Sequence, residues 1–97
     1  MLYLYHTRGD IMKYDQQLIN RIKRLEGQLR GILNMMDEEK ECKDVVTQLS
    51  AVRSAIDKSI GLIVSKNLVT RMIEEEDSEE SKQKLIQEAV NLLVKSR

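Results

Sequence analysis

The sequence predicts an all-α protein whose chain folds into three helices. Apolar residues recur at three- and four-residue steps over long stretches, which is the period of an amphipathic helix. The chain has no proline, its aromatic residues are three tyrosines, and charged residues make up 33% of its 97 residues. This composition is typical of long solvated helices rather than of a β-sandwich or barrel. The length gives room for one small domain.

The first helix is predicted over residues 15–37. Its apolar residues follow one another by three or four positions and predict one buried stripe: Leu18, Ile22, Leu25, Leu29, Ile32 and Met36. Asp15 is a suitable N-cap residue. The acidic run 37–41 ends the stripe, so we expect the helix to end there.

The second helix is predicted over residues 42–75 and the third over 78–95, where Asp77 and Glu80 form a candidate capping box. A helix of about 30 residues is about 45 Å long. A compact chain of this size has a radius of gyration of only about 13 Å, so the second helix overhangs its own domain. We therefore expect a homo-oligomer that covers the exposed apolar surface, with a dimer as the minimum.

Residues 1–11 have neither a helical period nor the pattern of a secretory signal, and they predict a flexible extension before a domain at 12–97. His6 lies in this extension, where one histidine has no companion ligands. The longest apolar run is far shorter than the roughly 18 residues of a membrane span. A single cysteine excludes an internal disulfide. We expect a cytoplasmic protein without membrane contact, and the absence of enzyme motifs predicts that it is not an enzyme.

Basic and polar side chains gather on the face of the first helix that points away from its apolar stripe. They are Arg21, Lys23, Arg24, Gln28 and Arg30. The net charge of the chain is zero, so these cations form a local surface of the kind that contacts nucleic-acid phosphates. Arg53 would extend this surface if the first two helices pair antiparallel. The competing interpretation is a helical scaffold whose charges only solubilise it.

Four features of the sequence are distinctive in combination: R-I-K-R-L-E-G-Q-L-R-G-I at 21–32, the cysteine after the acidic run, V-V-T-Q-L-S-A-V-R-S-A-I-D at 45–57 and E-A-V-N-L-L at 88–93. They occur together in the CsoR-type transcriptional repressors, and the chain resembles that family over residues 12–97. The resemblance implies a three-helix subunit, antiparallel dimers assembled into a flat tetramer, and binding to operator DNA that an inducer reverses. It also implies that Arg21 or Arg24, together with Arg53, contacts DNA.

The resemblance places the inducer site at Cys42 and at positions 67 and 71. Copper sensors of the family hold a histidine and a second cysteine at the latter two positions, whereas this chain has Asn67 and Arg71. Asn67 is similar to the persulfide-sensing, CstR-like branch, which keeps a cysteine at position 71. No cofactor is therefore expected, and copper(I) is disfavoured because it needs at least two thiolate or imidazole ligands.

Cys42 opens the second helix, where the helix dipole favours the thiolate form. Arg71 lies 29 residues further along, about 44 Å at helical rise, so the two meet only if a second chain packs antiparallel. We predict a DNA-binding repressor in which modification of Cys42 by reactive sulfur or another electrophile lowers operator affinity. The alternatives are a copper-type metal-sensitive repressor and a DNA-binding paralogue that has lost its inducer.

Overall fold

The computed structural model describes residues 13–74 and 78–96 of the chain. These residues form three helices and no strand: α1 (Gln16–Asp37), α2 (Cys42–Glu74) and α3 (Glu79–Lys95). The prediction of an all-α fold with three helices is confirmed, and no helix end differs from the expected one by more than one residue. The predicted extension 1–11, including His6, lies outside the described residues.

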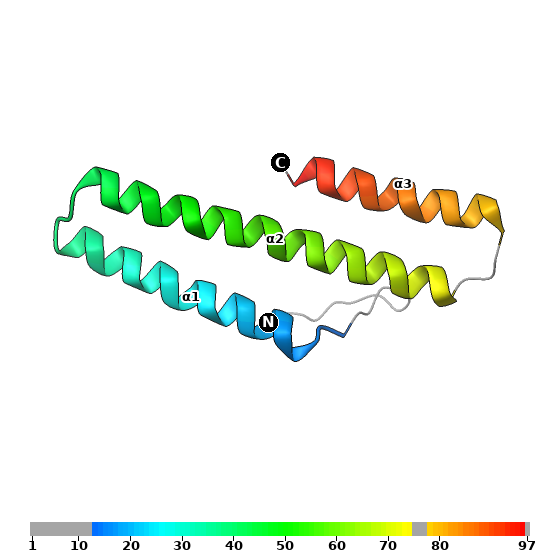
Figure 1. The fold of residues 1–97 in the computed structure, drawn as a ribbon, viewed down its shortest axis with the longest axis horizontal. Coiled ribbons are helices and arrows are strands. Elements are labelled where there is room, and N and C mark those ends of the chain that lie inside the picture. Colours follow the sequence, from blue (N-terminus) through cyan, green and yellow to red (C-terminus); the bar gives the residue numbers. More distant parts are fainter. Residues whose placement is uncertain (1–12, 75–77, 97) are drawn as a thin grey trace.

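α2 is the central element of the fold (Figure 1). α1 runs antiparallel along the N-terminal part of α2, and α3 folds back along its C-terminal part on another side. The described part of the chain measures 57 × 26 × 21 Å, and its radius of gyration is 17.6 Å. A compact chain of this length would have a radius of gyration of about 13 Å. The long second helix therefore gives the described part of the chain an elongated shape, as we expected from the length of that helix.

Polar residues at the helix ends satisfy backbone groups that the helices leave unpaired. The Asp15 carboxylate caps α1 by accepting a hydrogen bond of 2.9 Å from the Leu18 amide. The Ser78 hydroxyl caps α3 in the same way, at 3.0 Å from the Ser81 amide. The predicted capping box of Asp77 and Glu80 is therefore wrong, because the capping oxygen comes from the next residue. Asp77 itself lies outside the described residues.

The core between α1 and α2 is narrow. Leu25, Ile32 and Val52 form its centre, and the partly buried Val45 and Ala55 pack against them. One neighbouring helix covers only a thin stripe of α1, so every second residue of the predicted apolar stripe remains outside the core. These outer residues are Ile22, Leu29 and Met36, whose exposed fractions are 44–50%.

α3 adds a second, smaller contact with α2, in which Leu85 and Ala89 are buried. Three glycines lie inside the described helices, where a glycine can permit the close approach of another backbone. In this structure a Cβ atom added to Gly27, Gly31 or Gly61 would meet nothing within 4 Å, so the single chain does not provide that approach. Within the two described ranges, no helix combines the length and the apolar character needed to cross a membrane.

Candidate nucleic-acid interface and sensing residues

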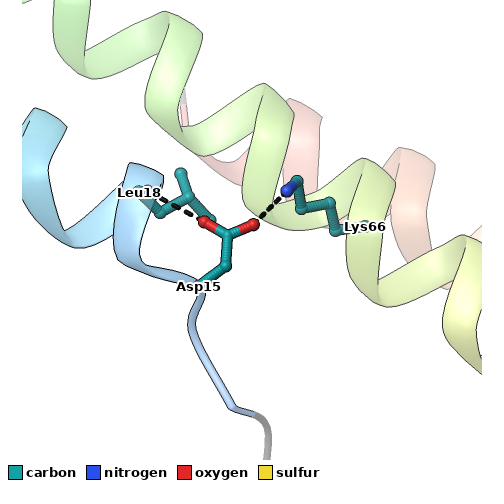
Figure 2. Close-up of polar contacts among 3 residues, drawn as sticks. All are labelled: Asp15, Leu18 and Lys66. Carbon is teal, nitrogen blue, oxygen red and sulfur yellow. Dashed lines mark hydrogen bonds and ion pairs between the residues drawn. The ribbon is translucent and has the colours of Figure 1, made fainter.

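The contact between Asp15 and Lys66 shows which residues of α1 and α2 lie level with one another (Figure 2). One carboxylate oxygen of Asp15 accepts a hydrogen bond from the Lys66 ammonium group, and the other accepts the capping bond from Leu18. The hydrogen bond from Lys66, followed by that from the Leu18 amide, lowers the pKa of Asp15 below its ordinary value. Because the helices are antiparallel, each step forward on α1 corresponds to one step back on α2. Residue 23 is therefore level with residue 58, and residue 28 with residue 53.

The predicted basic residues are open to solvent. Lys23, Arg24, Gln28, Arg30 and Arg53 are exposed, and Arg21 is half-buried. Among the described residues, none of the five cations in this set forms a salt bridge with an acid of the chain. These positive charges are therefore available to a polyanion, as phosphate contacts require.

The two sides of the α1 and α2 pair differ in chemistry. We call the line of buried residues along which α1 and α2 touch the seam. Each residue turns a helix by about 100°, so a side chain one or four positions after a buried residue lies on one side of the seam. A side chain one or four positions before a buried residue lies on the other side. A two-fold rotation relates antiparallel helices, so the same offset places residues of both helices on the same side. We call one side the apolar flank: it holds Ile22, Leu29 and Leu33 of α1 and Leu49 and Ile56 of α2, all at least 40% exposed.

We call the other side the basic flank, and it consists of Arg21, Arg24 and Gln28 of α1 with Lys58 of α2. Arg24 immediately precedes the buried Leu25, and Lys58 immediately precedes the buried Ser59, which gives both cations the same offset. The register places Lys58 level with the segment between Arg21 and Arg24. The sequence analysis did not identify Lys58. Its position directly before Ser59, a small residue on the seam, could have indicated that it lies on this side.

Arg53 lies on the other side of the pair. It immediately follows the buried Val52, so its offset from the seam is that of the apolar flank. Although it is level with Gln28, it does not extend the basic flank of its own chain. Its predicted contact with DNA stays a prediction. Lys23 and Arg30 lie on the outer face of α1, between the two flanks.

The predicted sensing residues occupy opposite ends of α2. Cys42 is the first residue of this helix and its thiol is exposed. Asn67 and Arg71 lie near the other end, where they line a small pocket between α2 and α3. α2 is continuous over 33 residues, about 50 Å at helical rise, so Cys42 cannot reach either residue within one chain.

Arg71 has a partner that the sequence did not reveal. Its guanidinium group donates a hydrogen bond of 3.0 Å to the carboxylate of Glu88, which lies on α3. Both side chains are about half exposed, so this ion pair adds little stability by itself. In the single chain it directs the Arg71 side chain toward α3. Periodicity within α2 could not indicate this contact, because it depends on how α3 docks.

The chain belongs to the family of metal-sensitive transcriptional repressors: the model of that family matches residues 14–95. Curated relatives include the Bacillus subtilis (strain 168) protein YrkD, which is 54% identical over 63 residues, covering 65% of this chain and 100% of YrkD. The copper-sensing transcriptional repressor RicR of Mycobacterium tuberculosis (strain H37Rv) is 46% identical over 69 residues, covering 64% of this chain and 71% of RicR.

The fold is also similar to that of a solved family member. The nickel-responsive transcriptional regulator InrS matches with a TM-score of 0.65 and 28% identity, over 91% of this chain and 98% of InrS. The predicted family resemblance is confirmed. Because the family consists of transcriptional repressors, the chain is a transcriptional regulator and not an enzyme.

A metal ion, which the family name implies, does not fit the residues of one chain. No group of three or more His, Cys, Asp or Glu side chains within 13–74 and 78–96 is placed to hold an ion. At one end of α2 the described residues offer a single thiolate ligand, Cys42. At the other end, the positive charge of Arg71 opposes a cation, and its bond to Glu88 occupies an oxygen that could bind one.

Proposed function

We propose that the protein is a DNA-binding repressor of the metal-sensitive family that contacts DNA through its basic flank. The observation that carries this proposal is the sorting of charge across the α1 and α2 pair. Arg21, Arg24 and Lys58 share one side without an acidic partner among the described residues, while the large exposed apolar side chains of the two helices gather on the opposite side. Lys23, Gln28 and Arg30 add charge and a polar contact next to this flank.

The repressor is a homo-oligomer in this proposal, with a tetramer favoured over a dimer. The support is the apolar flank, whose large side chains are exposed in the single chain. Apolar areas of this kind on a small protein mark an interaction site. An oligomer would also place several basic flanks on one DNA molecule, which multiplies the electrostatic contribution to binding.

Titration of the DNA upstream of the protein's own gene tests DNA binding. Arg24→Ala and Lys58→Ala should each weaken binding and lower the slope of log affinity against log salt by about 0.9 for every phosphate that the variant no longer neutralises. Lys84→Ala is the matched control, because Lys84 is exposed on α3 and belongs to neither flank. Equal affinities for all three variants would show that the basic flank is not the DNA-binding surface.

For the inducer, the comparisons favour a metal ion over thiol modification, since the named relatives sense copper or respond to nickel. The predicted persulfide mechanism has no support from them. One observation keeps thiol modification as a second candidate: Cys42 is exposed at the start of α2. The expectation that no cofactor is needed stays a prediction.

Release of bound DNA separates these candidates. Copper(I), nickel(II) and a polysulfide are each added to the complex formed by the parent protein and by Cys42→Ala. A metal-sensitive repressor releases DNA with one of the ions. A thiol-based repressor releases DNA with polysulfide only while Cys42 is present. A protein that stays bound under every condition is a paralogue without either response.

A further inference from the structure

Gly27 lowers the stability of α1 without a compensating contact inside the chain. A glycine in the interior of a helix is unfavourable relative to alanine, because it loses more conformational freedom on folding. Gly27 lies in the middle of α1 and is exposed. A Cβ atom added to it would meet nothing within 4 Å among the described residues, so the single chain has room for a side chain there. Any benefit from this glycine therefore comes from a molecule outside the chain.

Cations surround Gly27 on the surface of α1. Residues three or four positions apart on a helix are neighbours, with Cβ atoms about 5–6 Å apart. The four neighbours of this kind are Lys23, Arg24, Arg30 and Gly31, and all of them are exposed. None of the three cations forms a salt bridge with an acid among the described residues. Gly27 is therefore a position without a side chain among three available positive charges.

Glu26, the acid nearest to Gly27 in the sequence, does not cover this position. Each residue turns a helix by about 100°, so the two residues point in different directions. Glu26 immediately follows the buried Leu25, which places it on the side of the apolar flank. Gly27 lies on the outer face of α1, next to Arg24 of the basic flank. A molecule that contacts Gly27 therefore meets cations first.

We propose that a phosphate group of the DNA backbone lies against α1 at Gly27, with Lys23, Arg24 and Arg30 around it. This inference rests on the proposed DNA binding and specifies the point of closest approach. The attraction between a phosphate and each cation rises as their distance falls. A side chain at position 27 would stand between the phosphate and the helix and would keep it away from the three cations.

The contact positions the DNA without reading its sequence. A glycine has no side chain that could reach the edge of a base, and contacts of lysine and arginine with phosphate are the same for every sequence. The contact at Gly27 should therefore contribute equally to the binding of any duplex. It also gives Lys23 and Arg30, on the outer face of α1, the same bound group as Arg24 of the basic flank.

Side chains of increasing size at position 27 test the contact. Gly27→Ala and Gly27→Gln keep every charge of the chain and favour the helix, so both should raise the midpoint of urea unfolding. DNA affinity should nevertheless fall, by about three-fold for alanine and by about ten-fold or more for glutamine, as one charge-assisted contact is lost. Titrations use the DNA upstream of the protein's own gene and an unrelated duplex, and both affinities should fall by the same factor.

The salt dependence of binding identifies the contact that is lost. In Gly27→Gln the slope of log affinity against log salt should fall by about 0.9, although no charge has been removed, because one phosphate is no longer neutralised. Gly61→Ala is the matched control: it replaces another helical glycine with open space around it, and its neighbours Asp57 and Lys58 have opposite charges. This control should raise the unfolding midpoint and leave DNA affinity unchanged.

Four results would overturn the inference. Unchanged DNA affinity of both Gly27 variants, while Arg24→Ala and Lys58→Ala weaken binding, refutes the contact at Gly27 and leaves the basic flank standing. Unchanged affinity in all four variants refutes the proposed DNA-binding surface as well. A loss confined to the upstream DNA would assign Gly27 to base recognition. A loss accompanied by a changed sedimentation coefficient without DNA would place Gly27 in a contact between copies of the chain.

Discussion

Leu25 and Leu29 are the same residue type, one turn apart on α1, and they differ in what covers them. Leu25 is 6% exposed at the centre of the core, whereas Leu29 is 44% exposed on the apolar flank. Leu25→Ala removes a packed side chain and should lower the free energy of unfolding by about 2–5 kcal/mol. A domain of this size has only about 5–15 kcal/mol in total, so the loss is large.

Leu29→Ala should behave differently, because much of that side chain is covered only when a second copy is present. In a dilute, monomeric sample its cost should be about 1 kcal/mol or less. At concentrations where the parent protein assembles, the cost should rise, since the variant lacks a contact of the assembled state. Urea unfolding followed by circular dichroism at several protein concentrations measures both variants.

Two results would contradict these predictions. A loss of under about 1 kcal/mol for Leu25→Ala would mean that α1 and α2 do not pack through the described core. A cost for Leu29→Ala that stays the same at every concentration would mean that no second copy covers this part of the apolar flank.

Two further substitutions test the helix ends. Asp15→Asn keeps a capping side chain but removes the charge that bonds to Lys66. That bond lowers the pKa of Asp15 in the folded state from its ordinary 3.8. The stability difference between the variant and the parent should therefore be full above the unfolded-state pKa of Asp15 and disappear as pH falls through its folded-state pKa. Urea unfolding at a series of pH values measures this difference, and a difference that persists in acid contradicts the prediction. Ser78→Ala should destabilise α3 by about 1 kcal/mol, because it removes the capping hydroxyl group. Relative to the parent, amide hydrogen exchange should become faster in α3 than in α1. An equal increase of the exchange rate in both helices would show that the effect of the cap is not local.

The number and limits of the helices could be predicted because their information is local. Apolar spacing, the cap at Asp15 and the acidic run after Asp37 all act within a few residues of the chain. The same local pattern could not show which half of the stripe would be buried. That outcome depends on the width of the neighbouring helix, and it left Leu29 exposed while Leu25 entered the core.

The basic residues on α1 could also be predicted, whereas their grouping with residues of α2 needed the register. Arg53 lies within the sequence block at 45–57 that resembles the family. Its offset from the seam nevertheless places it on the side of the helix pair opposite Arg24. Lys58 has no such motif, but the register brings it level with the segment before Arg24. Glu88 was not recognised for the same reason: its contact with Arg71 is set by the docking of α3 and not by any pattern within one helix.

An antiparallel dimer makes a further prediction about the sensing residues. If α2 pairs with α2 of a second copy about a two-fold axis at residue 55, Cys42 lies level with residue 68 of the other copy, between its positions 67 and 71. In that arrangement an Arg71→Cys chain should bring two cysteines from different chains together. A disulfide requires Cα atoms within about 7 Å.

Mild oxidation should therefore link Arg71→Cys chains covalently in pairs, seen as a dimer on a non-reducing gel that a reductant removes. Val69→Cys is the matched control: Val69 is 56% exposed, two residues away on the same helix, and its offset places it on the side of the basic flank. Adding Cys42→Ala to Arg71→Cys should abolish the link, because the two thiols introduced at position 71 would lie far apart in an antiparallel dimer. Equal cross-linking of the two cysteine variants would mean that random collisions and not this arrangement bring the thiols together.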